Sequence, residues 1–97
     1  MAFALWITGA PGSGKSTIAK ELVKRIDAEL LRLDEIRRLI TPKPSYSREE
    51  KELVYRALAY MGHLLVKKNF NVVFDATDEL GVGRLLAKKL IKNFVKK

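Results

Sequence analysis

The stretch Gly9–Thr17 (GAPGSGKST) constrains the fold of this chain more than any other part of its sequence. It follows the apolar run Ala2–Thr8 and opens the segment Lys15–Asp27, whose apolar residues recur with helical spacing. A continuous apolar run is typical of a strand that is covered on both faces, as in a parallel sheet. Strand, glycine-rich loop and helix in this order are the context in which the pattern G-x-x-x-x-G-K-[ST] binds phosphate. The alternative, a glycine-rich turn that matches by chance, does not explain the flanking strand and helix.

The chemistry of this loop predicts a nucleoside triphosphate as its ligand. Glycines let backbone N–H groups converge on phosphate oxygens, and the first helical turn adds unpaired donors and a positive dipole end. In this pattern Lys15 reaches the β- and γ-phosphates, and the Ser16 hydroxyl ligates magnesium. We therefore expect ATP and Mg²⁺ as cofactors. The predicted nucleotide-binding residues are Gly9, Ala10, Pro11, Gly12, Ser13, Gly14, Lys15, Ser16 and Thr17.

The remaining sequence continues the alternation of strands and helices. The apolar runs Glu29–Leu33 and Asn71–Thr77 predict strands. Predicted helices cover Asp34–Ile40, Ser47–Lys68 and Arg84–Asn93. This rhythm implies parallel strands with right-handed crossovers. Together with the phosphate-loop motif, it predicts a three-layer α-β-α fold of the P-loop NTPase kind. We expect residues 1–97 to form a single domain.

The long helix has both a start signal and an apolar stripe. Its start is the capping box SREE, in which Ser47 is the cap and Glu50 the third helical position. Its stripe predicts a set of buried side chains, namely Leu53, Val54, Ala57, Leu58, Met61, Leu64 and Leu65.

Two aspartates are predicted to lie at the carboxyl ends of strands, where ligands gather in parallel sheets. Asp75 ends the third apolar run and could hold Mg²⁺ directly or through water. Its alternative role is to cap the next segment, although Thr77 and Asp78 could serve there instead. Asp34 ends the second run, where it could accept a proton from an attacking hydroxyl. The alternative for Asp34 is the cap of the following helix.

A basic residue follows one turn after Asp34. Arg37 could clamp an anionic substrate, and Arg38 is expected to point elsewhere, with a surface arginine as the alternative for each. The only histidine, His63, and the only tryptophan, Trp6, are expected to be structural.

The charge of the chain bounds its partners. The formal net charge is +8, and six basic residues but no acidic one lie between Arg84 and Lys97. The charge favours either simple solubility or an anionic partner, so nucleic acid is a second candidate ligand for the basic last helix. No apolar run approaches the roughly 18 residues that cross a membrane. The absence of cysteine is compatible with a cytoplasmic location, which we expect.

Four segments together resemble the adenylylsulfate kinase family of P-loop kinases. They are LWITGAPGSGKSTIAKEL, LRLDEIRRLI, YSREEKELVYRALAYMGHLL and NVVFDAT. The phosphate loop alone is shared by many NTPases, but its combination with LDEIR and VVFDAT at these spacings is more specific. The resemblance implies transfer of the ATP γ-phosphoryl to the 3′-hydroxyl of adenylylsulfate, and a sheet of order 2-3-1-4-5. It places Gly9–Thr17 at the ATP phosphates, Asp34 near the accepting hydroxyl, Arg37 near anionic substrate groups and Asp75 at the Walker B position.

The end of the chain departs from the family pattern. Strands four and five, the lid and the adenine loop have no counterpart, so we expect three strands in the order 2-3-1, as in a truncated or engineered kinase half. Strand 1 would then be an open edge that favours a homodimer. Because the lid supplies charge stabilisation, nucleotide binding is expected more than efficient turnover. The alternative function is a phospho-ligand or nucleic-acid binding module.

Overall fold

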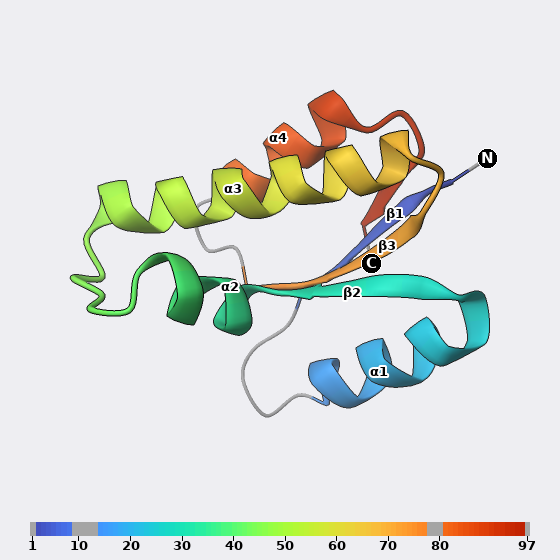
Figure 1. Ribbon diagram of the computed structural model, residues 1–97, viewed down its shortest axis with the longest axis horizontal. Coiled ribbons are helices and arrows are strands. Elements are labelled where there is room, and N and C mark those ends of the chain that lie inside the picture. Colours follow the sequence, from blue (N-terminus) through green and yellow to red (C-terminus); the bar gives the residue numbers. More distant parts are fainter. Residues whose placement is uncertain (1, 9–13, 78–80, 97) are drawn as a thin grey trace.

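The computed structural model describes residues 2–8, 14–77 and 81–96. The elements in chain order are β1 (Ala4–Ile7), α1 (Lys15–Ile26), β2 (Ala28–Arg32), α2 (Leu33–Ile40), α3 (Arg48–Lys67), β3 (Asn71–Asp75), α4 (Val82–Leu90) and β4 (Phe94–Lys96). The four strands form one parallel sheet in the order β2-β3-β1-β4. Helix α1 covers one face, and α3 and α4 cover the other (Figure 1). Helix α2 follows the end of β2, and its buried residues Leu33 and Ile36 belong to the core on the side of α3. The predicted three-layer α/β fold is confirmed. Each helix in the described ranges is too short or too polar to span a bilayer.

The alternation of side chains along the strands divides the core into two parts. Trp6 and Phe74 point to the side of α3 and are fully buried, with their ring centroids 4.7 Å apart. Ile7 and Val73 belong to the smaller cluster under α1, together with Ala19 of that helix. The interpretation of Trp6 as a core residue is therefore confirmed.

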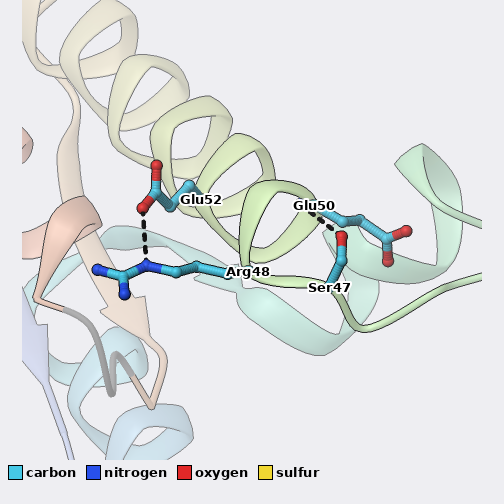
Figure 2. Close-up of polar contacts among 4 residues, drawn as sticks. All are labelled: Ser47, Arg48, Glu50 and Glu52. Carbon is cyan, nitrogen blue, oxygen red and sulfur yellow. Dashed lines mark hydrogen bonds and ion pairs between the residues drawn. The ribbon is translucent and has the colours of Figure 1, made fainter.

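The amino end of α3 begins as the sequence predicts. Ser47 is its N-cap, and the Ser47 hydroxyl accepts a hydrogen bond from the backbone N–H of Glu50 at 3.2 Å (Figure 2). The reciprocal half of the capping box differs, because the Glu50 carboxylate accepts its hydrogen bonds from Ser45 instead. Arg48, the first residue of the helix, forms an exposed ion pair with Glu52, four residues further on, at 3.4 Å (Figure 2).

The buried face of α3 is rotated from the predicted stripe. Val54 and Leu58 are fully buried as predicted, but Leu53 is 66% exposed. Two further members of the stripe, Met61 and Leu64, are also exposed. The core positions on α3 are taken instead by Tyr55 and by two small residues, Ala59 and Gly62. Packing against both the sheet and α4 selects this face, because a side chain at Gly62 would overlap the ring of Phe74.

The expectation of three strands is wrong, because β4 pairs with β1. Its register sets Phe94 opposite Ala4, and the backbone N–H of Ala4 donates to the carbonyl of Asn93 at 2.9 Å. The Asn93 side chain also donates to the carbonyl of Ala2 at 3.2 Å. The tail is short, but strand pairing uses backbone groups, so the lysines at its end do not prevent it. A homodimer through an open β1 edge therefore loses its premise.

Candidate functional site

The phosphate-loop residues Gly9, Ala10, Pro11, Gly12 and Ser13 lie outside the described residues, as do the side chains of Lys15 and Ser16. The described part of the motif begins at Gly14, which has a positive φ of 85° and is the N-cap of α1. Glycine adopts this backbone conformation without a steric penalty. The Gly14 carbonyl accepts a hydrogen bond from Ile18 at 3.0 Å, and the Thr17 side chain is exposed.

The amino end of α1 suits an anion. Within the described part of the chain, no side chain caps this end and no acidic residue occupies its first turn. The first N–H groups of a helix have no intrahelical partner, and the helix dipole favours negative charge there. This end of α1 therefore has the electrostatic character that the phosphate-loop motif requires.

Asp75 is the one charged residue among the described buried residues, with 4% of its surface exposed. It is the last residue of β3 and alternates with Val73, so it faces the side of the sheet that α1 covers. Directly opposite in the β2–β3 register is Arg32, the last residue of β2. The Nε atom of Arg32 lies 3.5 Å from Oδ2 of Asp75. This pair brings a cation to the predicted magnesium residue, and our sequence analysis did not identify Arg32.

An open groove of about 660 Å³ extends from Arg32 along α2 and the loop that follows it. We call it the arginine groove. Its lining residues are Arg32, Asp34, Arg37, Arg38, Thr41, Pro42, Pro44 and Tyr46. Three arginines and one acid give it a net positive lining, which suits an anionic ligand that also presents a group to a carboxylate.

The structure brings Asp34 and Arg37 together in this groove. It also excludes the alternative cap role of Asp34 and corrects the expected direction of Arg38. Helix α2 begins at Leu33 and has Arg32 at its N-cap position, so Asp34 lies inside the first turn and does not cap the helix. Strand β2 ends at Arg32, one residue earlier than predicted, so α2 begins at Leu33 instead of Asp34. Arg38 lines the same groove instead of pointing elsewhere, because the groove follows α2 to its end.

Tyr46 is a second groove residue that sequence reasoning missed. It has a φ of 58°, and its ring centroid lies 5.8 Å from Cζ of Arg37, within the range of a cation–π contact. The Glu50 carboxylate orders this loop by accepting hydrogen bonds from Ser45 and from the N–H of Tyr46. These bonds, from Ser45 above all, hold the pKa of Glu50 below its ordinary value. The segment SYSREE could have suggested the hydrogen bonds of Glu50 with Ser45 and Tyr46. It could not have suggested the contact of the Tyr46 ring with Arg37.

His63 has no part in the arginine groove. It lies in the carboxyl half of α3, is half-buried, and contacts the Tyr60 ring at a centroid distance of 6.0 Å. The placement agrees with the structural interpretation of this residue.

The described residues fit a magnesium ion that is held largely by a nucleotide. They contain no cluster of three or more metal-ligating side chains. Mg²⁺ is commonly held by one or two carboxylates, with substrate phosphates and waters completing its octahedron. Asp75 supplies a buried carboxylate on the α1 side of the sheet. That chemistry matches the prediction for Asp75, which stays a prediction, as does the part of Ser16.

Comparisons of the sequence and of the structure with known proteins lead to related P-loop kinases. A family model described as an AAA domain matches residues 5–93. The probable adenylyl-sulfate kinase of Archaeoglobus fulgidus is 32% identical over 100 residues, which cover 98% of this chain. A mutant APS kinase of Mycobacterium tuberculosis has a TM-score of 0.84 at 26% identity, with 98% of this chain and 73% of that chain covered.

Two further facts set the scope of this similarity. The same mycobacterial kinase in complex with AMPPNP and APS gives a TM-score of 0.81 at 24% identity, with 98% of this chain and 60% of that chain covered. At that identity the likeness shows the fold. The chain spans 64% of the length of the Archaeoglobus relative.

Proposed function

Because this chain belongs to the AAA-domain family and is a P-loop kinase domain related to adenylyl-sulfate kinases, we propose that it binds ATP and phosphorylates a nucleotide-like alcohol. The proposed acceptor is adenylylsulfate, through its 3′-hydroxyl. The single observation that carries the proposal is the arginine groove, which begins at the carboxyl end of β2 and combines three guanidinium groups with one exposed carboxylate.

Each residue of the proposed site has a defined task. Gly9–Thr17 would hold the triphosphate, with Lys15 neutralising charge at the β- and γ-phosphates. Ser16 and Asp75 would hold magnesium, which supplies charge stabilisation of the transferring group when it is bound. Arg37 would bind the anionic part of the acceptor.

Asp34 is the proposed proton acceptor. The acceptor hydroxyl oxygen forms a bond to the γ-phosphorus, the bond from that phosphorus to the bridging oxygen breaks, and ADP leaves. The hydroxyl proton passes to the Asp34 carboxylate. The exposure of Asp34 in the first turn of α2 supports this role, since its carboxylate is accessible to a ligand in the groove.

A single-turnover assay with γ-labelled ATP, Mg²⁺ and adenylylsulfate tests the proposal. The wild-type chain should transfer label to the acceptor, and Asp34→Asn should slow transfer by about 10²–10⁴-fold while both ligands still bind. Glu35→Gln, at the exposed neighbouring position, is the matched control and should leave transfer unchanged. Binding of both ligands without transfer in the wild type would favour the second candidate, a phospho-ligand binding module.

A further inference from the structure

Arg32 lies between the two halves of the proposed site. Its Nε atom is 3.5 Å from Oδ2 of Asp75, and the two side chains are 26% and 3% exposed. The same Arg32 lines the arginine groove. The Nε atom is buried, and among the described residues it has no hydrogen-bond partner, so its contact with Asp75 is electrostatic. One guanidinium is thus shared between the predicted magnesium residue and the predicted acceptor groove.

We propose that Arg32 couples the two ligands, so that occupation of Asp75 by magnesium and nucleotide strengthens the binding of an anionic acceptor in the groove. The proposal rests on the proposed function. In the free protein, the Asp75 carboxylate offsets much of the Arg32 charge. If Asp75 holds a magnesium ion, its negative charge would be compensated there, and the charge of Arg32 would become available to the groove.

The geometry sets the direction and the scale of the effect. Two unit charges about 4 Å apart in a water-like medium interact strongly enough to change a binding constant about fivefold, and burial of Asp75 increases this. The nucleotide also brings its own negative charge, which repels an anionic acceptor. That repulsion is nearly the same with or without Arg32, so comparison of two variants isolates the part that Arg32 contributes. Coupling of two binding sites is reciprocal, so the acceptor also strengthens the binding of magnesium and nucleotide. While the groove is empty, Arg32 competes with magnesium for the Asp75 carboxylate and so opposes magnesium binding.

The experiment measures two binding constants by calorimetry, without turnover. Adenylylsulfate is titrated into the full chain with and without saturating Mg·AMPPNP, in the wild type and in Arg32→Gln. The coupling factor is the ratio of the two acceptor affinities. It should be about fivefold larger in the wild type than in Arg32→Gln. Arg32→Gln should also bind Mg·AMPPNP more tightly than the wild type when no acceptor is present.

Arg38→Gln is the matched control. Arg38 lines the same groove, and in the described part of the chain no ion pair joins it to Asp75. Arg38→Gln should lower the affinity for the acceptor but keep the wild-type coupling factor. If Arg32→Gln does not fold, Arg32→Lys replaces it; its ammonium lacks the fork of donors that serves both sides, so its coupling should be reduced.

The outcomes separate this proposal from the function on which it rests. Equal coupling factors in the wild type and the Arg32 variant, with both ligands bound, overturn the role of Arg32 alone. A wild-type chain that binds no Mg·AMPPNP overturns the proposed function, and the coupling falls with it.

Discussion

Ser45 donates two hydrogen bonds to Oε2 of Glu50, from its N–H at 2.9 Å and from its hydroxyl at 2.7 Å. The second carboxylate oxygen accepts from the N–H of Tyr46 at 3.4 Å. These contacts fasten the groove loop to the first turn of α3. Because Tyr46 also packs on Arg37, the clamp connects the start of a helix to the wall of the proposed acceptor site.

This clamp predicts a pH dependence of stability. The pKa of Glu50 is held below its ordinary value of 4.5 in the folded chain, mainly by the hydrogen bonds from Ser45. The stabilisation is therefore fully present above about pH 4.5 and is lost as the pH falls through the lower folded-state pKa. The free energy of unfolding, measured with denaturant at pH 7 and pH 3, should fall less between these two pH values in Glu50→Gln than in the wild type. Glu49→Gln, an exposed change in the same turn, should show the same fall in unfolding free energy between the two pH values as the wild type.

Two leucines of α3 test which face of the helix is buried. Leu58 is fully buried and Leu53 is 66% exposed, although the apolar spacing assigned both to the core. Leu58→Ala should lower the free energy of unfolding by about 2–5 kcal/mol, because it removes buried methyl groups and leaves a cavity. Leu53→Ala should change it by only about 0.5 kcal/mol. Urea unfolding measures both, and equal losses would contradict the observed rotation of α3.

The fold was largely predictable because its signals are local. The loop Gly9–Thr17 between a strand and a helix, and the apolar runs of the other strands, determine the α/β class. The order 2-3-1 followed from the resemblance to the kinase family, and it agrees with the observed sheet. The face of α3 was not predictable, since periodicity gives the width of an apolar stripe but not its centre. Packing decides the centre, and it brings Gly62 against Phe74. Strand β4 was missed because a three-residue strand carries little pattern of its own.

The candidate site was predictable where a motif carries it. Asp34 and Arg37 were identified, and they lie in one groove. Arg32 and Tyr46 were not, because their roles depend on contacts between distant segments. The sequence carried one usable signal for Arg32, because an arginine within the predicted strand Glu29–Leu33 is a charge that needs a partner if it is buried. Its partner Asp75 follows only from the strand register.

A lysine substitution in the loop tests the phosphate-binding hypothesis. Lys15 is the only basic residue in the motif Gly9–Thr17. Lys15→Ala should remove most affinity for Mg·ATP, because the loop then retains no full positive charge to offset the phosphates. Lys20→Ala, an exposed change later in α1, should leave it nearly unchanged. Calorimetric titration measures both, and wild-type affinity in Lys15→Ala would end the phosphate-loop interpretation.

The basic end of the chain gives the last prediction, which separates nucleotide binding from binding of a nucleic acid. Lys88, Lys89 and Lys92 are exposed on and just after α4. If they contact phosphates, replacing all three with glutamine should lower the slope of log affinity against log salt for duplex DNA by roughly three units, since each neutralised phosphate releases about 0.9 counterion. The affinity for Mg·ATP should stay nearly constant, because these lysines do not belong to the proposed nucleotide site. Equal loss of both affinities would place the basic helix at the nucleotide, and an unchanged DNA slope would leave solubility as the role of its charge.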